Sequence, residues 1–327
     1  MKAVMIRDHA LIWEDVPDLK LSEGDVLVEV HAAAVNRADL MQVDGDYPPP
    51  AGYPEWPGLE IAGVVKEMSE TAARDSQWKI GDPVCALLGG GGYAQYAAVH
   101  HSMLMPVPSG LSMIEAAALP EAFATAYLNL FMEGGAKAGQ TFLMHAGASG
   151  LASVVIPMAK AFGLRVITTV LNPEKAASIS HLKADVVVDT SSENIAEVLQ
   201  REAETGHPLN LAIDCLGGEQ VGACLPYVAY GCRWILIATL AGDRTDVNMR
   251  TMFMKNIRLI GSTLRSKPPE IKAQILVNLV RDIWPKVESG EIRPTIYKVL
   301  PMAQANAAHA LLRQGDSVGK VVLTTDC

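Results

Sequence analysis

The eight residues from His145 to Ala152 read HAGASGLA and stand between the apolar run TFLM and the segment SVVIPMAKAFG. A glycine-rich turn between a strand and a helix offers backbone N–H groups and the positive end of the helix dipole to a pyrophosphate. Gly147 is placed to make the tight turn. Ser149 and Ala152 stand where the G-x-G-x-x-G pattern has its second and third glycines. The segment therefore favours a dinucleotide phosphate loop with two substituted positions.

These substitutions are small. The hydroxyl of Ser149 can itself bind a phosphate or ribose, and Ala152 adds one methyl group, which we expect to fit with slight spreading of helix and strand. Pro157 lies inside the expected helix, where it removes a hydrogen bond and should kink the helix.

A hydrolase is the competing interpretation, because GASGL differs by one residue from the nucleophile elbow G-x-S-x-G. Asp214 and His309 follow in the hydrolase order, and residues 89–92 offer a glycine-rich oxyanion loop. Position 151 is Leu where the sharp elbow needs glycine. The β-rich segment ahead of the loop also has no place in a simple hydrolase, so we favour the dinucleotide interpretation.

The next strand ends in Leu171 and Asn172, with no acid to bind the ribose 2′-hydroxyl of NAD. Lys175 is placed to meet a 2′-phosphate, or it is simply a solvated lysine at the start of a helix. Asp214 closes a later strand, where it either faces a ligand or caps the following turn.

The expected elements explain how these residues are positioned. About 118 residues at the start carry short β runs separated by Gly and Pro, which indicate a mostly-β domain. Strands and helices then alternate, as in a parallel sheet covered on both faces. The last 60 or so residues hold a helix over 269–290 and short strands over 296–300 and 319–325, and we expect these strands to rejoin the first domain.

Composition excludes several classes of protein. The 327 residues carry a net charge of −9 without a basic run, which argues against nucleic acid as a partner. We see no secretory signal and no apolar stretch near the roughly 20 residues of a membrane span, so we expect a cytoplasmic protein. Five cysteines, with no C-x-x-C, predict neither a disulfide framework nor structural zinc, and most are expected to be buried. They are Cys85, Cys215, Cys224, Cys232 and Cys327.

With these residues in view, the chain resembles the zinc-less quinone oxidoreductases of the medium-chain dehydrogenase/reductase superfamily, most closely the tumour-suppressor-inducible branch. The resemblance runs nearly end to end. It is carried by NRADLMQ (36–42), DYPPPAGYP (46–54), PGLEIAG (57–63), WKIGDPVCALLGGGGYAQY (78–96), AAALPEAFATAY (116–127), HAGASG (145–150), DCLGG (214–218), STLRS (262–266) and GKVVL (319–323).

The resemblance implies an α/β protein with a GroES-like β-barrel catalytic domain (1–119 and 263–327). A doubly wound Rossmann domain (120–262) would bind NADPH. Ser149 and Lys175 match the family pattern. Ala152, Leu171, Asn172 and Thr190 depart from it, which leaves NADH or dual use open. The implied cofactor-binding residues are Thr125, Gly147, Ala148, Ser149, Gly150, Leu151, Asn172, Lys175, Leu216, Gly217, Ala238, Leu240, Leu264, Arg265 and Lys320.

No catalytic zinc is expected, because Asn36 and Leu59 stand where zinc relatives have Cys and His. His100 and His101 are expected to point to opposite faces of a strand. Without a Lewis acid, a quinone or conjugated enone is the better hydride acceptor, since its own π-system delocalises the charge. By resemblance, Tyr47 donates to the substrate oxygen and Asn36 lies near the nicotinamide and substrate.

The sequence thus predicts an NADPH-dependent quinone reductase that acts as a homodimer, with IRLIGSTL as the edge strand of the interface. Two alternatives stay open. One is a reductase for the C=C bond of enoyl thioesters, although no basic patch for an acyl carrier is seen. The other is a non-catalytic nucleotide-binding protein, which the changes at Ala152, Leu171 and Thr190 suggest.

Overall fold

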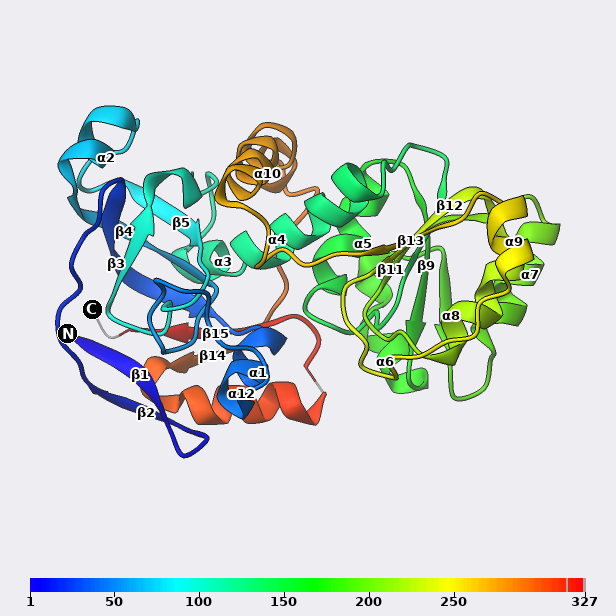
Figure 1. Cartoon of the computed structure of the whole chain (residues 1–327), viewed down its shortest axis with the longest axis horizontal. Helices are drawn as coiled ribbons and strands as arrows, with labels where there is room; N and C mark the ends of the chain where they lie inside the picture. Colours follow the sequence, from blue (N-terminus) through cyan, green and yellow to red (C-terminus); the bar gives the residue numbers. More distant parts are fainter. Residues whose placement is uncertain (316, 326–327) are drawn as a thin grey trace. The chain divides into compact units, whose positions relative to one another are not determined.

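The computed structural model describes residues 1–315 and 317–325, which form two compact units. The β-rich unit comprises residues 1–124, 267–290 and the described residues from Pro294 onward, and the parallel-sheet unit comprises residues 125–266 and 291–293. No helix of this described part is long and apolar enough to cross a bilayer. The expected α/β class is confirmed (Figure 1).

The β-rich unit is built on one large sheet with strand order β14-β15-β3-β4-β5-β7, to which β6 adds by pairing with β3. A separate hairpin pairs β1 with β2. The strands are β1 (Lys2–Arg7), β2 (Ala10–Asp15), β3 (Asp25–Ala34), β4 (Glu60–Met68), β5 (Pro83–Leu87), β6 (Tyr96–His100), β7 (Leu104–Pro106), β14 (Ile296–Pro301) and β15 (Lys320–Thr324).

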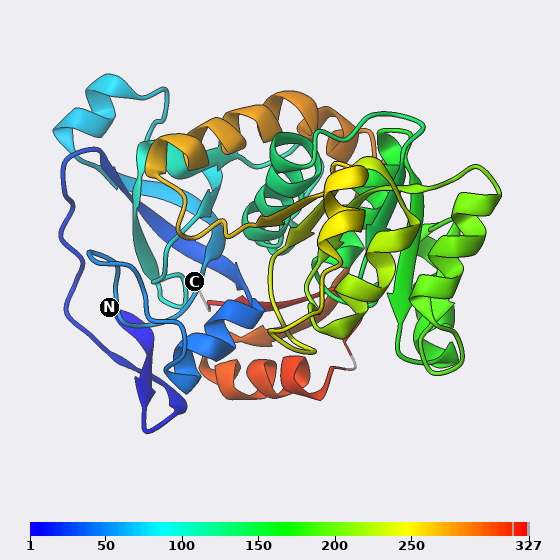
Figure 2. The same cartoon turned by 45° about the vertical axis from the view of Figure 1, so that its right-hand side comes forward.

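Helices cover this unit, with α10 and α12 on opposite sides of its strands (Figures 1 and 2). The helices are α1 (Arg37–Asp44), α2 (Glu70–Asp75), α3 (Met113–Ala117), α10 (Pro269–Asp282), α11 (Trp284–Glu288) and α12 (Ala305–Gln314). Helix α4 (Pro120–Tyr127) begins in this unit and ends in the other.

The last strand closes the β-rich unit, as the sequence predicted. β15 pairs antiparallel with β3, with Val322 opposite Ala34 and Leu323 opposite Ala33. Residues 320–323 of β15 are all buried. The C-terminal strand is therefore part of the core that the first hundred residues begin.

The parallel-sheet unit has strand order β10-β9-β8-β11-β12-β13, with every neighbouring pair parallel. All four residues of β8 are buried, which requires cover on both faces and confirms the expected architecture. The strands are β8 (Thr141–Met144), β9 (Arg165–Val170), β10 (Val186–Asp189), β11 (Leu209–Asp214), β12 (Val228–Leu236) and β13 (Arg258–Gly261). The helices are α5 (Ala152–Ala161), α6 (Pro173–Ser178), α7 (Ile195–Glu204), α8 (Glu219–Cys224) and α9 (Met249–Met254).

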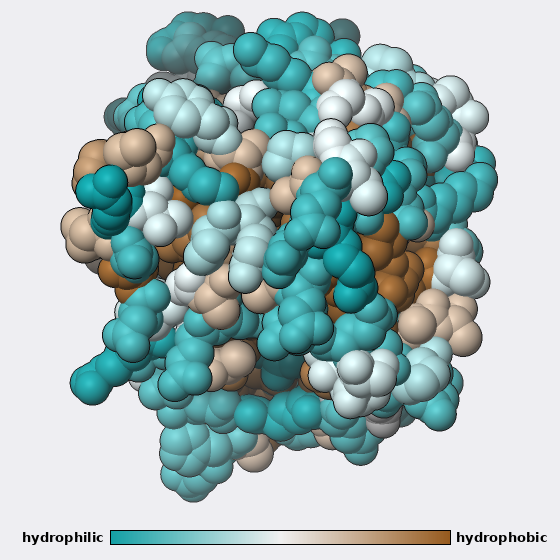
Figure 3. Space-filling model, turned by 90° about the vertical axis from the view of Figure 1, so that its right-hand side faces the viewer, coloured by the Kyte–Doolittle hydropathy of each residue, from teal (hydrophilic) through white to brown (hydrophobic). Residues whose placement is uncertain are grey.

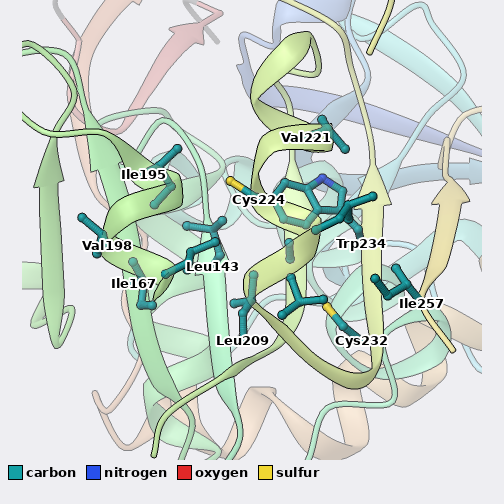
Figure 4. Packing of buried hydrophobic residues seen from close by; sticks show 14 of the residues in the cluster. Leu143, Ile167, Ile195, Val198, Leu209, Val221, Cys224, Cys232, Trp234 and Ile257 are labelled. Carbon is teal, nitrogen blue, oxygen red and sulfur yellow. The ribbon is translucent and has the colours of Figure 1, made fainter. Parts of the chain in front are cut away.

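Apolar side chains from α7 and α8 pack against this sheet (Figure 4). Leu143, Leu209 and Trp234 come from the strands, and Val198 and Val221 from the helices. On the sheet, α5 also contacts β8 and β9, and it runs over ten residues with Pro157 inside it. Strand β13 lies at the edge of the sheet, as expected for IRLIGSTL.

One expectation about histidines is wrong. β6 ends at His100, and His101 begins a short 3₁₀ turn, so the two residues are not successive members of a strand. Their rings lie 4.5 Å apart between centroids, tilted by 31°. The turn brings together two side chains that a continued strand would have separated.

Cys85, Cys224 and Cys232 are free thiols and are buried, as expected. Cys215 is partly exposed, and Cys327 lies outside the described residues.

A buried polar chain crosses the β-rich unit. The Asp39 carboxylate accepts hydrogen bonds from the backbone N–H groups of Asn36 (2.7 Å) and Gly58 (3.0 Å) and from the Tyr93 hydroxyl (3.0 Å). The Tyr93 oxygen also lies 3.3 Å from Nε2 of His309, whose buried Nδ1 has no partner among the described residues. Burial is the main cause that lowers the pKa of His309 to about 4, with Arg313 adding to it.

This shift predicts a stability loss in acid. Between pH 6.5 and about 4 the unfolded chain protonates His309 while the folded chain does not, so stability falls as the pH is lowered. The His309→Gln variant should lose about 3 kcal/mol less than the wild type over this range. Urea unfolding at a series of pH values measures both slopes, and equal slopes would show that His309 is not held neutral.

Candidate functional site

The loop from His145 to Leu151 joins β8 to α5, and its first turn has room only for glycine. A Cβ atom on Gly147 would lie 2.5 Å from Oγ1 of Thr168. That hydroxyl cannot easily retreat, because it is buried and donates to the carbonyl of Met144 at 2.7 Å. The N–H of Gly147 donates to the carbonyl of Thr169 at 2.8 Å, so the loop is fastened to β9.

Beyond this turn the loop presents uncommitted donors. Within the described residues, the backbone N–H groups of Ala148, Gly150 and Leu151 have no hydrogen-bond acceptor, and all three residues are partly exposed. Ser149 shapes this stretch, because its Oγ accepts a hydrogen bond from the N–H of Ala152 at 3.1 Å. Backbone N–H groups without an acceptor ahead of a helix are the kind of donor that an anion-binding loop uses.

Ala152, which replaces the family's glycine, is fully buried where α5 begins. The helix therefore accommodates its methyl group against the sheet.

The carboxyl ends of parallel strands meet at one edge of a sheet, so the other predicted cofactor segments adjoin this loop's edge. After β9, Leu171 is 75% exposed, and Asn172 caps α6 by accepting from the N–H of Lys175 at 2.9 Å. Thr190 donates its hydroxyl to the carbonyl of Val170 at 3.0 Å. The hydroxyl of Thr190 therefore hydrogen-bonds to the backbone of β9.

The Asp214 carboxylate stabilises the turn that follows β11. Its Oδ1 accepts from the N–H groups of Leu216 (2.7 Å) and Gly217 (3.1 Å), and Oδ2 accepts from the Trp234 indole (2.9 Å). The capping interpretation is therefore the correct one. Gly217, at φ +63°, leaves no room for a side chain beside the carbonyl of Gly242.

The remaining predicted residues of this unit lie after β12 and β13. Leu240 is 60% exposed, whereas Leu264 and Arg265 are buried, and Ala238 follows the end of β12. Thr125 lies on α4 and accepts at its carbonyl from the side chain of Asn129 at 2.8 Å.

In the β-rich unit the structure brings two predicted residues together. Nζ of Lys320 donates to Oδ1 of Asn36 at 2.6 Å and forms an ion pair with Oε1 of Glu60, also at 2.6 Å. The amide nitrogen of Asn36 donates to the same Glu60 oxygen (3.0 Å) and to the carbonyl of Ala34 (3.3 Å). Both ion-pair partners are buried, with side-chain exposures of 4% and 0%. We expected Lys320 to bind the cofactor. Its ammonium group instead contacts Asn36 and Glu60 within this network.

Glu60 is the residue that the sequence analysis missed. It is the acid of the PGLE motif, at the first position of β4. An acidic residue at the start of an otherwise apolar strand was the feature of the sequence that could have identified it. Its second oxygen, Oε2, accepts the backbone N–H of Glu121 at 2.8 Å. Tyr47 follows α1 and is partly buried, with its N–H directed to the carbonyl of Met41 at 3.3 Å.

The acids around this network resist ionisation. Burial is the largest cause that raises the pKa of Asp39 to about 6, although its hydrogen bonds oppose the shift. Burial followed by the Glu60 charge raises the pKa of Glu121 to about 8. Among residues 1–315 and 317–325, no group of three or more His, Cys, Asp or Glu side chains is arranged to hold a metal ion.

A parallel sheet with a glycine-containing loop after β8, in one chain with a β-rich unit closed by its C-terminal strands, is the architecture of two-domain dehydrogenases and reductases. Two family models match the chain. The alcohol dehydrogenase GroES-like domain matches residues 22–109, and the zinc-binding dehydrogenase domain matches residues 150–281.

Known proteins resemble nearly the whole chain. A quinone oxidoreductase-like protein 2 homolog from Nematostella vectensis is 30% identical over 309 residues, 93% of this chain and 83% of the relative. The quinone oxidoreductase of Thermus thermophilus, solved also with NADPH, has a TM-score of 0.82 and 31% identity, covering 99% of this chain and all of that one. A highly reducing polyketide synthase of Aspergillus terreus is 28% identical over 330 residues, 96% of this chain but 12% of the synthase.

The chain therefore belongs to the medium-chain dehydrogenase/reductase superfamily, within its zinc-less quinone oxidoreductase family. The resemblance to this family seen in the sequence is confirmed.

The buried ion pair predicts a large loss of stability when only one partner is removed. Lys320→Met leaves the Glu60 carboxylate buried without a counter-charge and should cost about 3–5 kcal/mol. Adding Glu60→Gln should recover most of this loss, because the uncompensated charge is then gone. Urea unfolding followed by tryptophan fluorescence tests this, since four of the five tryptophans lie in the β-rich unit. Additive losses would refute the coupling.

The loop after β8 has no room for a side chain at position 147, so a substitution there should weaken nucleotide binding. Gly147→Ala should weaken nucleotide binding by about tenfold or more, roughly 1.4 kcal/mol, because its methyl group displaces the loop from Thr168. Gly261→Ala is the matched control, since nothing lies within 4 Å of a Cβ atom there. Fluorescence titration measures both, and equal affinities would show that the loop does not carry the nucleotide.

Proposed function

We propose that the chain is an NADPH-dependent quinone oxidoreductase, in which hydride passes to a quinone or conjugated enone without zinc. The three uncommitted N–H groups of Ala148, Gly150 and Leu151 carry the cofactor part of this proposal. The relative solved with NADPH supports it as well. The quinone oxidoreductase relatives support the substrate class.

In this proposal the loop over 147–151 holds the pyrophosphate and Lys175 faces the 2′-phosphate. Asn172 fixes the start of α6 and so positions Lys175. Thr125, Leu216, Gly217, Ala238, Leu240, Leu264 and Arg265 complete the nucleotide site. When bound, the dihydronicotinamide supplies the hydride.

The β-rich unit supplies the polar groups for the substrate. Both N–H groups of the Asn36 amide are used by Glu60 and Ala34, so Asn36 holds the site in place rather than donating to the substrate. The donor to the substrate oxygen is then Tyr47. We keep residues 1–119 and 263–327 as the catalytic domain and 120–262 as the nucleotide domain.

We propose a homodimer through the edge strand β13. Apolar side chains of the same unit are strongly exposed, among them Tyr230 (75%), Met249 (71%) and Phe253 (67%). On the face shown in Figure 3, hydrophobic residues lie in small groups between hydrophilic ones.

A second candidate is reduction of the C=C bond of an enoyl thioester, which the likeness to a polyketide synthase segment favours. The same nucleotide site and hydride chemistry serve both. Turnover of quinones against a short enoyl thioester at equal concentrations separates them.

Lys175 gives the first test. We expect NADPH to bind more tightly than NADH, and Lys175→Ala should weaken NADPH by about tenfold while leaving NADH unchanged. Lys137→Ala is the control, since this exposed lysine precedes β8 at the opposite edge of the sheet. Equal binding of both nucleotides to the wild type would indicate dual use. Binding of neither would leave a non-catalytic protein.

A further inference from the structure

One buried amide on α1 fastens the loop that contains Tyr47. The Gln42 side chain is 6% exposed, and its Nε2 donates to the carbonyl of Glu55 at 2.8 Å. Burying an amide costs free energy unless it is hydrogen-bonded. The contact therefore holds the backbone at Glu55 in one place relative to α1, because any other place would deprive the buried amide of this bond.

The two ends of the loop meet at adjacent residues of α1. The N–H groups of Asp46 (2.9 Å) and Tyr47 (3.3 Å) donate to the carbonyl of Met41, and Gln42 is the next residue of the helix. The bond from Tyr47 is the longer of the two and shares its acceptor. The loop over 46–55 is thus closed on the helix, as in an Ω-loop, and the Gln42 amide closes it.

The loop is stiff between these ends. Pro48, Pro49 and Pro50 follow Tyr47 directly and fix three φ angles in succession. A turn comes next, in which the N–H of Tyr53 donates to the carbonyl of Pro50 at 3.2 Å. A displacement at the far end of the loop is therefore passed along to Tyr47 rather than absorbed on the way.

The segment beyond the loop is fastened independently of Gln42. Asp39 lies about one turn earlier on α1 and accepts the N–H of Gly58 at 3.0 Å. The Trp56 indole donates to the carbonyl of Gly91 at 2.9 Å. Because these contacts keep the segment in place, loss of the Gln42 amide should shift the loop and leave the fold of the unit intact.

We propose that Gln42 is a positioning residue for the reduction and acts through Tyr47. The inference rests on the proposed function, in which the Tyr47 hydroxyl donates to the substrate oxygen. Gln42 keeps the loop closed on α1, and the closed loop holds that hydroxyl where negative charge develops as the substrate accepts hydride. Gln42 itself contacts neither substrate nor nucleotide.

The test is a double-mutant cycle of Gln42→Met with Tyr47→Phe. Methionine is similar to glutamine in length but cannot donate, and phenylalanine lacks only the hydroxyl. With NADPH and a simple benzoquinone, kcat/KM should fall about 10²-fold in Tyr47→Phe and about tenfold in Gln42→Met. In the Tyr47→Phe background, Gln42→Met should cost less than about twofold, because no hydroxyl is left to misplace. Losses that simply multiply would overturn the inference.

Gln95→Met is the matched control, because it also removes a hydrogen bond between a glutamine side chain and the backbone. Oε1 of Gln95 accepts the N–H of Lys2 at 2.8 Å, which joins β1 to the residue before β6 in the same unit. This variant should keep the wild-type kcat/KM. A loss equal to that of Gln42→Met would indicate general loosening of the unit and refute a positioning role.

A second readout needs no turnover. Fluorescence titration should give the same NADPH affinity for Gln42→Met and the wild type, because Gln42 acts on the substrate side alone. A matching fall in NADPH affinity, or a Tyr47→Phe variant with the wild-type rate, would contradict the role of Gln42 and leave quinone reduction standing. A wild type that reduces no quinone or enone with either nucleotide would overturn the proposed function and this role with it.

Discussion

The buried contact between Lys320 and Glu60 is the constraint on which the β-rich unit depends. It joins the last strand of the chain to β4, and through Asn36 it also fixes the start of α1. Removing two charges from water costs several kcal/mol, and the contact offsets this only because the remaining polar atoms are hydrogen-bonded. Asn36 and the N–H of Glu121 supply those bonds. The contacts of Lys320, Glu60 and Asn36 thus hold β15 against the rest of the β-rich unit and also fix the positions of its buried polar side chains.

A fixed ammonium has a chemical consequence as well. Its charge is balanced by Glu60 at 2.6 Å, so Lys320 stabilises the buried polar network. Burial raises the pKa of both acids beside this network, of Asp39 to about 6 and of Glu121 to about 8, so only Glu121 is mainly protonated at neutral pH.

The parallel-sheet unit follows a different logic. Its binding edge is a property of parallel topology, which brings the ends of β8, β9, β11 and β12 together whatever their side chains. The individual residues then decide which N–H groups remain available. Asp214 satisfies two N–H groups of its own turn, while the loop after Gly147 leaves three uncommitted.

The sequence by itself determined the local features of this protein. Strand and helix alternation and the glycine of the loop after β8 follow from periodicity and from short motifs whose geometry is local. Only the tertiary structure decided the polar network, because Asn36, Glu60 and Lys320 are separated by up to 284 residues and no local pattern links them. It also decided that Asp214 caps a turn and that His100 and His101 lie side by side. Long-range packing decides which buried charged groups lie next to one another. Burial and these neighbouring charges set the pKa values of the buried acids, which the spacing of residues along the chain does not encode.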